Sequence, residues 1–263
     1  MPQPSFTHPL GLPFIELQSV DSTNNYAREQ IHAGLAQHGM TIFAREQTAG
    51  KGQRGKAWTT EKGSNIILSL IIKPQPLQLA QQFQLSACAA VAIHGFFMKY
   101  AGADTKIKWP NDLYWQDRKA GGILIENIVG SRDPIAIGSG VRRWDWSIIG
   151  VGINVNQTSF PTDLSNPVSL KQITGKIFNP MDLAKELCLV FTKRFNELIE
   201  EGFENIYTTY LAHLYKRRST VKLKKGSKVF ETIIEGVSPT GKLITKHAIQ
   251  EEFDFGEVQW MIK

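Results

Sequence analysis

The 263-residue sequence has few cysteines and no long apolar run, and both absences narrow the class of protein. Its two cysteines, Cys88 and Cys188, form no CxxC pair and lie in apolar segments with helical spacing. We therefore expect two buried, reduced thiols and exclude a disulfide scaffold. The longest uncharged apolar stretch, residues 85–93, is far shorter than the roughly 18 residues of a membrane-spanning helix, so a membrane protein is excluded.

The N-terminal segment also lacks the features of a secretory signal. Residues 1–14 contain no lysine or arginine ahead of an apolar stretch, so we expect a cytoplasmic protein. Hydrophobic residues make up 42% and charged residues 21%, which excludes disordered and fibrous classes. The length fits one large domain, or a large domain followed by a small one.

No nucleophilic or metal-binding constellation stands out. The six histidines are scattered, and no Ser-His-Asp, Cys-His or metal-ligand spacing joins them to other residues. They are His8, His32, His38, His94, His213 and His247. Chemistry that depends on a histidine base or a histidine-bound metal is therefore not indicated.

Positive charge is concentrated near the C-terminus. The net charge is +6, and residues 216–263 contain ten basic and six acidic residues, with seven basic and no acidic residues within 216–228. This stretch could bind nucleic acid, or it could be a solvated strand edge on which lysines prevent aggregation. We favour the strand edge, because no aromatic residues for base stacking are interleaved with the charges.

Hydrophobic periodicity predicts an α+β part followed by a β part. We expect helices after the capping cluster at residues 21–24 and over residues 79–100, 181–201 and 203–215. Strands are expected at residues 41–47 and 65–72. The segments KIKWPNDLYW, AGGILIENIVG, PIAIGSG and WSIIGVGINVN predict short strands with glycine turns between them, in a mixed or mainly antiparallel sheet.

Beyond residue 216 the pattern changes to strands of five to eight residues separated by glycine-containing turns. This pattern is typical of a small β-barrel at the end of an α+β domain. We therefore divide the chain into a domain at residues 1–215 and a β-barrel domain at residues 216–263.

The glycine-rich segment GKGQRG at residues 50–55 matches two known patterns only in part. A strand follows it instead of the helix that a dinucleotide-binding fold requires, and Ala57 replaces the Ser or Thr of a phosphate-binding P-loop. What remains is a loop whose backbone can approach an anion, with positive charges from Lys51, Arg54 and Lys56. A mobile basic hairpin loop is the alternative.

Two further segments carry candidate polar residues. KWPND at residues 108–112, followed by Lys119, combines lysines and a carboxylate that suit a phosphate–Mg²⁺ site. An exposed turn with surface charges is the alternative. Asn154, in GVGINVN, is disfavoured in a strand unless its amide is used, so it is either a polar contact in an apolar cleft or a residue at a bulge or strand end.

Taken in order, these segments resemble the biotin–protein ligases: Ser22-Thr23-Asn24, the glycine loop ending in Trp58, KWPND, the lysine followed by AGG, and GVGINVN. The resemblance covers almost the whole chain. It implies a mixed sheet packed with helices, of the class II aminoacyl-tRNA synthetase-like type, plus a C-terminal SH3-like β-barrel. It also implies that ATP and Mg²⁺ convert biotin to biotinyl-5′-AMP, which then biotinylates one lysine of a carrier protein.

The resemblance assigns roles by position. The residues expected to bind biotin are Ser22, Thr23, Asn24, Gln47, Lys51, Gly52, Gln53, Gly121, Gly122 and Gly152. Those expected to bind ATP or the adenylate are Trp58, Lys108, Asn111, Asp112, Lys119 and Asn154. The expected catalytic residues are Lys119, Arg54 and Lys56, and Asp112 is the expected metal ligand.

The implied acceptor is a biotin carboxyl carrier protein of acetyl-CoA carboxylase, with the ligase either a monomer or a homodimer. Because Ser-Thr-Asn begins at residue 22, we expect the class without an N-terminal DNA-binding domain, and neither DNA binding nor repression. Two alternatives are a lipoate–protein ligase, which uses the same acyl-adenylate chemistry, and a basic nucleic-acid-binding module.

Overall fold

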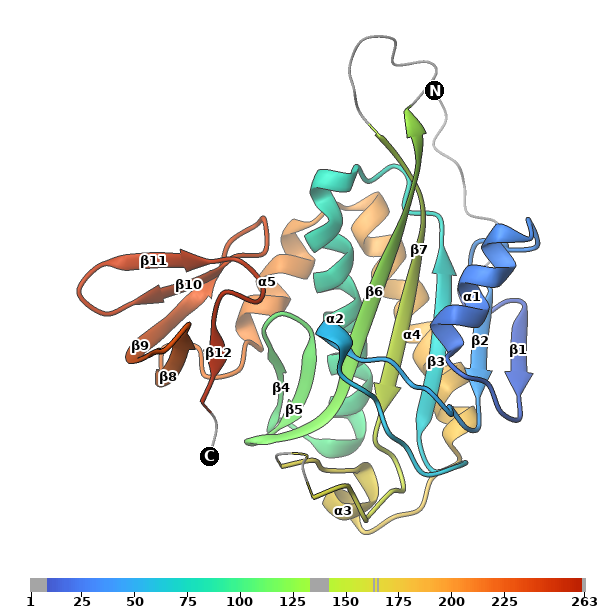
Figure 1. The fold of residues 1–263 in the computed structure, drawn as a ribbon, viewed down its shortest axis with the longest axis horizontal. Coiled ribbons are helices and arrows are strands. Elements are labelled where there is room, and N and C mark those ends of the chain that lie inside the picture. The colour runs from blue at the N-terminus through green and yellow to red at the C-terminus, as the bar shows by residue number, and fades with distance from the viewer. Residues whose placement is uncertain (1–8, 133–141, 163, 165, 262–263) are drawn as a thin grey trace.

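The chain folds around a seven-stranded sheet, with a five-stranded sheet in its C-terminal part (Figure 1). The computed structural model describes residues 9–132, 142–162, 164 and 166–261, so the strand expected at residues 134–140 lies outside the described residues. The strands of the large sheet are β1 Phe14–Leu17, β2 Thr41–Ala44, β3 Ile66–Ile72, β4 Thr105–Lys108, β5 Asp112–Trp115, β6 Arg118–Arg132 and β7 Arg142–Ile153. Their spatial order is β1-β2-β3-β7-β6-β5-β4.

The large sheet is mixed, as expected. β1 and β2 pair in parallel, and the other neighbouring strands pair antiparallel. Every residue of β3 is buried, because this central strand is covered on both faces. Its sequence, IILSLII, accordingly does not alternate between apolar and polar residues.

The helices cover the two faces of the sheet unequally. They are α1 Thr23–His32, α2 Gln82–Ala101, α3 Leu170–Thr174, α4 Pro180–Glu200 and α5 Glu204–Ala212. Helices α2 and α4 lie behind the sheet, and α1 lies on the opposite face (Figure 1). Helix α2 is apolar on nearly all sides because it contacts the sheet, α4 and α5. Within the described residues, no helix has both the length and the apolar character needed to cross a membrane.

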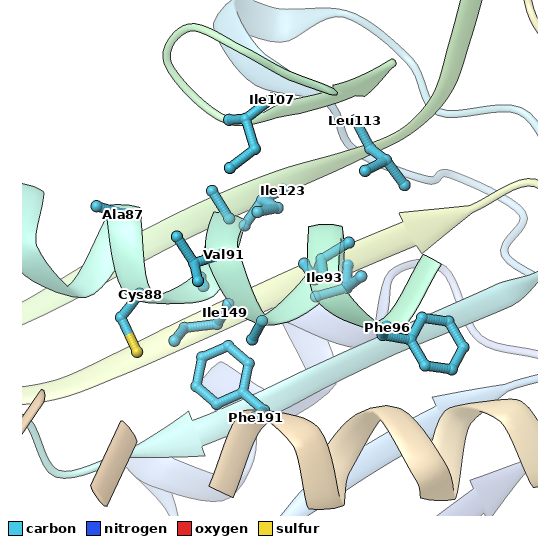
Figure 2. Close-up of a cluster of buried hydrophobic side chains, with 14 of the residues drawn as sticks. Ala87, Cys88, Val91, Ile93, Phe96, Ile107, Leu113, Ile123, Ile149 and Phe191 are labelled. Carbon is cyan, nitrogen blue, oxygen red and sulfur yellow. The ribbon is translucent and has the colours of Figure 1, made fainter. Parts of the chain in front are cut away.

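The main core lies between the sheet and these two rear helices. Val91 and Ile93 of α2 face Ile123 and Ile149 of the sheet, and Phe191 approaches from α4 (Figure 2). A smaller apolar cluster lies under α1 on the opposite face. Both cysteines are free and buried, which confirms the expectation for the thiols.

The C-terminal sheet is antiparallel, in the order β11-β10-β9-β8-β12. Its strands are β8 Thr220–Lys225, β9 Lys228–Val237, β10 Leu243–Lys246, β11 Gln250–Phe253 and β12 Gln259–Trp260. The small β unit is thus confirmed, while the domain boundary at residues 215/216 stays a prediction. Three lysines of the basic stretch pair with carboxylates, which favours a solvated surface: Lys216 with Asp117, Lys222 with Glu231, and Lys225 with Glu257.

The expectation of short strands was confirmed for KIKWPNDLYW, which forms β4 and β5, but short strands with glycine turns were wrong for AGGILIENIVG and WSIIGVGINVN. Strands β6 and β7 have 15 and 12 residues, and the glycines at 121, 122, 150 and 152 lie inside them. These glycines leave room for neighbouring groups to approach the strands rather than reversing the chain. Strand β2 ends at Ala44 instead of reaching residue 47, and the sequence analysis missed the short elements β1 and α3.

Replacing Phe191 with alanine should lower the free energy of unfolding by about 3–5 kcal/mol, because the side chain is fully buried between α2 and the sheet. Urea denaturation followed by circular dichroism measures this loss. Leu189→Ala, on the same helix but 65% exposed, should change stability by no more than about 0.5 kcal/mol. Equal losses in the two variants would contradict the core described here.

Candidate functional site

On the face of the sheet that carries α1, neighbouring strands share a row of positions without side chains, which we call the glycine lane. Gly122 of β6 lies opposite Gly152 of β7, and Gly150 lies two residues along on the same face. On the next strand, Ser69 lies opposite Gly150. The glycines form an open floor on which other groups can lie against the backbone.

The indole of Trp58 lies directly on this floor. A Cβ added to Gly152 would come within 2.4 Å of Trp58 Cε2, so any other residue at this position would displace the ring. The indole Nε1 is buried, and no hydrogen-bond acceptor for it lies among the described residues. Trp58 is thus packed through its ring face while its polar group stays unused.

The glycine loop folds back on itself and docks above β6. Trp58 N donates to Gly50 O at 2.9 Å, and Gly52 N donates to Lys56 O at 2.6 Å. Gln53 begins a single 3₁₀ turn, and its Nε2 donates to Asn111 Oδ1 at 2.7 Å. The predicted loop and the KWPND motif therefore meet in space.

Neutral polar groups gather at one end of the lane, where α1 begins. Thr23 N donates to Gln47 Oε1 at 2.8 Å, and the side chain of Asn24 packs against Gly150. Ser22 holds the N-cap position of α1 and is 1% exposed, but its side chain makes no capping hydrogen bond. Three of the residues predicted to bind biotin, Ser22, Thr23 and Gln47, therefore lie together. They offer uncharged donors and acceptors.

Positive charge gathers at the opposite end. Lys119 Nζ lies 2.7 Å from Asp112 Oδ1 and 5.8 Å from the centre of the Trp58 ring. The pKa of Lys108 is lowered to about 8, chiefly by burial; Asp112 opposes this shift, and the nearby ammonium groups of Lys119 and Lys56 add to it. A phosphate group placed here would face several cations with one carboxylate beside them.

The remaining predicted residues are arranged differently. Lys51 Nζ donates to Asn25 Oδ1, and Arg54 Nη1 donates to Gly256 O at 3.3 Å, so both side chains are held at the rim. Asn154 Nδ2 donates to the carbonyl of Val168 at 3.1 Å and so fixes the chain that enters α3. The expected ligand contacts of these three residues stay predictions.

Gly121 and Gly52 have backbone roles of different kinds. A Cβ on Gly121 would lie 2.7 Å from Gly152 O, so this glycine allows β6 and β7 to approach closely. Gly52 pairs with Lys56 inside the loop turn. Both residues therefore shape the floor or the loop through their backbone.

Three residues next to the polar end carry no motif that predicts them from the sequence. Ser69 Oγ lies 2.6 Å from Asn24 Oδ1, Glu126 Oε2 accepts from Asn24 Nδ2 at 2.7 Å, and Arg28 forms a 2.6 Å ion pair with Glu126. The lone serine in the aliphatic run IILSLII was the sequence feature that could have indicated a polar contact here. A buried hydroxyl needs a hydrogen-bond partner, and the sequence did not reveal which one.

A cavity of about 550 Å³ lies apart from this lane, between the β4–β5 region and the chain leading from α5 to β8. Its lining includes Lys106, Asp117, Lys216 and Arg217. None of the residues predicted to bind biotin or ATP lines it. The candidate site is therefore the glycine lane and not this cavity.

Comparisons with known proteins agree with the fold and the motifs. A model of the biotin/lipoate A/B protein ligase family matches residues 16–141. The biotin–[acetyl-CoA-carboxylase] ligase of Paracoccus denitrificans is 32% identical over 238 residues, which cover 88% of this chain and 92% of that protein. The bifunctional ligase/repressor BirA of Bacillus spizizenii is 34% identical over 204 residues, 76% of this chain. The chain spans 59% of that relative's length.

The solved structure of Aquifex aeolicus biotin protein ligase in complex with biotin and ATP superposes with a TM-score of 0.77 at 24% identity. That match covers 95% of this chain and 98% of the other, and it shows a shared fold. The family model and the Paracoccus relative together define the class, the biotin/lipoate ligases. Within that class, the chain belongs to the biotin protein ligase family.

Replacing Gly152 with alanine should displace Trp58 and open the glycine loop, because the added methyl group overlaps the indole. Trypsin cleavage after Lys51, Arg54 and Lys56 should then become several-fold faster. Gly95→Ala in α2 is the matched control, since nothing lies within 4 Å of the added Cβ there. Equal cleavage rates for the two variants would mean that Trp58 does not hold the loop against the sheet.

Proposed function

We propose that the chain is an ATP-dependent biotin–protein ligase that forms biotinyl-5′-AMP and transfers biotin to a lysine of a carrier protein. One observation carries this proposal: a single glycine-floored lane joins the neutral polar group around Thr23 to the cations around Lys119. Biotin has a neutral ureido head and a carboxylate tail, so it matches the two ends of the lane in order. ATP phosphates would meet the tail at the cationic end.

In the first step, an oxygen of the biotin carboxylate attacks the α-phosphorus of ATP. A carboxyl–phosphate bond forms, and the bond from the α-phosphorus to the bridging oxygen breaks, so pyrophosphate leaves. The Lys119 ammonium would lie between carboxylate and α-phosphate, where it offsets their repulsion and the charge that develops on phosphorus. Asp112, 2.7 Å away, holds the lysine in this position.

The residues present fit a magnesium ion carried by ATP. Asp112 Oδ1 is bound to Lys119, and no partner of its other oxygen lies among the described residues. Mg²⁺ in nucleotide sites is held by one or two carboxylates together with phosphate oxygens and water. Asp112 would hold the ion, which supplies further positive charge for the leaving pyrophosphate.

The second step needs no nucleophile from this chain. The amine of the acceptor lysine attacks the acyl carbon, an amide forms, and AMP leaves. Water would hydrolyse the same mixed anhydride, so a cover over the lane is required. The indole of Trp58 packs on the floor at Gly152 in this structure, so it would have to move outward with the glycine loop to admit a ligand, and the two would then cover the lane.

The neutral headgroup end favours biotin over lipoate. A dithiolane ring has no N–H or C=O group, so buried Thr23 and half-buried Gln47 would gain no further hydrogen bond from it. The Paracoccus relative is named as a ligase of acetyl-CoA carboxylase. We propose the biotin carrier domain of the same enzyme class as the acceptor. Biotin-dependent exchange of pyrophosphate into ATP tests the function, and exchange that depends on lipoate instead would overturn it.

Lys119→Gln should reduce the rate of biotin-dependent exchange by a factor on the order of a hundred to a thousand, because the variant loses the charge between carboxylate and phosphate. Lys216→Gln is the matched control, since it breaks a comparable ion pair with Asp117 at 2.8 Å. That variant should keep its activity. Full activity of Lys119→Gln would show that Lys119 takes no part in the reaction.

The KM for ATP should rise above pH 8. The pKa of Lys108 is about 8, so the free chain loses this cation as the pH increases through that value. If the charge holds the triphosphate, KM rises by up to about tenfold per pH unit. Lys108→Arg keeps its charge and should show a flat profile between pH 7.5 and about 9.5, since arginine does not titrate there. Identical profiles for the two proteins would contradict the role of Lys108.

A further inference from the structure

Lys108, at the cationic end of the lane, lies between aromatic rings from both sheets. It is the last residue of β4 and lies opposite Asp112 of β5, so the next residue of β5 on the same face is Tyr114. The ammonium nitrogen of Lys108 lies 5.0 Å from the centre of the Tyr114 ring. It lies 5.5 Å from the centre of the Trp260 ring, which comes from β12 of the C-terminal sheet. Tyr114 and Trp260 therefore form an aromatic pair at the ammonium group, with one ring from each sheet.

The aromatic pair is itself held in place by packing on both sheets. Tyr114 is buried, and its ring centre lies 5.1 Å from that of Tyr215. The Tyr215 ring lies 5.8 Å from the Trp260 ring, and its hydroxyl donates to Asp117 at 2.6 Å. On the C-terminal side, Trp260 pairs with Leu223 of β8. The two rings therefore have a defined position before any ligand binds.

No ion pair compensates the charge of Lys108. Within the part of the chain that the structure describes, no carboxylate oxygen lies within 4 Å of its ammonium group, and Asp112 on the neighbouring strand is bound to Lys119 instead, at 2.7 Å. The face of an aromatic ring attracts a cation through its quadrupole but does not neutralise it. The ammonium group is thus held in place while its charge stays available to an anionic ligand.

Trp260 makes this contact through its ring face and not through its N–H group. Its Nε1 is buried, and no hydrogen-bond acceptor for it lies among the described residues. A buried indole N–H usually has a partner, so hydrogen bonding gives no reason for a tryptophan at this position. Tryptophan does have the ring face that attracts cations most strongly. The contact with Lys108 is therefore what distinguishes Trp260 from another apolar side chain.

We propose that Trp260 and Tyr114 are positioning residues that hold the Lys108 ammonium group for the phosphates of ATP, so that the C-terminal sheet takes part in nucleotide binding through a cation–π contact. This inference rests on the proposed function and adds to it. A lysine side chain that is ordered before ATP arrives loses less conformational entropy on binding. Without the Trp260 ring, ordering Lys108 would offset part of the free energy of ATP binding.

Steady-state pyrophosphate exchange with varied ATP tests the proposal. Trp260→Leu should raise the KM for ATP roughly fivefold, while kcat and the KM for biotin stay unchanged. Trp260→Phe keeps an aromatic face and should restore most of the affinity for ATP. The matched control is Trp146→Leu on β7, because Trp146 is also half-buried and carries the ammonium group of Lys73 over its ring at 5.1 Å. This control should keep the KM for ATP of the unchanged protein.

A double-mutant cycle separates a positioning role from a general structural one. Lys108→Met should raise the KM for ATP on the order of ten- to a hundredfold, because the charged hydrogen bond to phosphate is lost while an apolar side chain of similar length remains. If Trp260 acts through the ammonium group, adding Trp260→Leu to Lys108→Met should raise the KM no further. Effects of the two substitutions that multiply would show that Trp260 acts elsewhere, and would overturn the proposal.

A variant with an indole of nearly unchanged shape covers the case in which Trp260→Leu does not fold, as judged by circular dichroism. Site-specific incorporation of 5,7-difluorotryptophan at position 260 keeps the ring but reduces the negative charge of its face. The KM for ATP should then rise about twofold, since the attraction to the ammonium group is weakened and the packing is kept. A KM equal to that of the unchanged protein would overturn the proposal.

Failure of the inference can be told apart from failure of the proposed function. If the unchanged protein does not catalyse biotin-dependent exchange, the proposed function is wrong and the inference with it. If the unchanged protein is active while Trp260→Leu behaves like Trp146→Leu, the function stands and the inference is overturned. The same holds if Lys108→Met leaves the KM for ATP unchanged.

Discussion

The site depends on a stretch of sheet that has no side chains. Gly122, Gly150 and Gly152 lie on one face of two adjacent long strands, so the backbone itself is the floor. A methyl group at 150 would collide with Asn24, and one at 152 would collide with Trp58. The packing of Asn24 at the polar end and that of the indole at Gly152 therefore both require these glycines.

The packing of the opposite face explains how the sheet stays stable although the glycine floor buries no side chains. Alternate residues of the same strands, such as Ile149 and Val151, pack against α2 and α4 in the main core. The floor glycines give up apolar burial on one face, while the other face keeps a dense aliphatic layer (Figure 2). The packed core behind the sheet therefore allows the glycine positions on the other face to remain without side chains.

The C-terminal sheet meets the cationic end of the lane. Trp109 of KWPND donates its indole N–H to Gly241 O at 2.9 Å and packs edge-on against Phe255. The glycine loop contacts the same unit through Arg54 and Gly256. The KWPND motif and the glycine loop are thus contacted by both sheets. The C-terminal sheet is therefore part of the surroundings of the site and not a separate appended module.

Local patterns in the sequence determined most of the helices, the buried strand β3 and the free thiols, because periodicity and capping act over a few residues. The prediction that the motifs belong to one site came from the family resemblance and not from any local pattern. The glycines of β6 and β7 were misread as turns, since a glycine needed for close approach looks the same in sequence as one that reverses the chain. Only the tertiary structure decided that Ser69, Glu126 and Arg28 reach Asn24 and Thr23 across separate elements. Hydrogen-bond partners of buried groups are set by strand register and helix placement, which no local pattern of residues encodes.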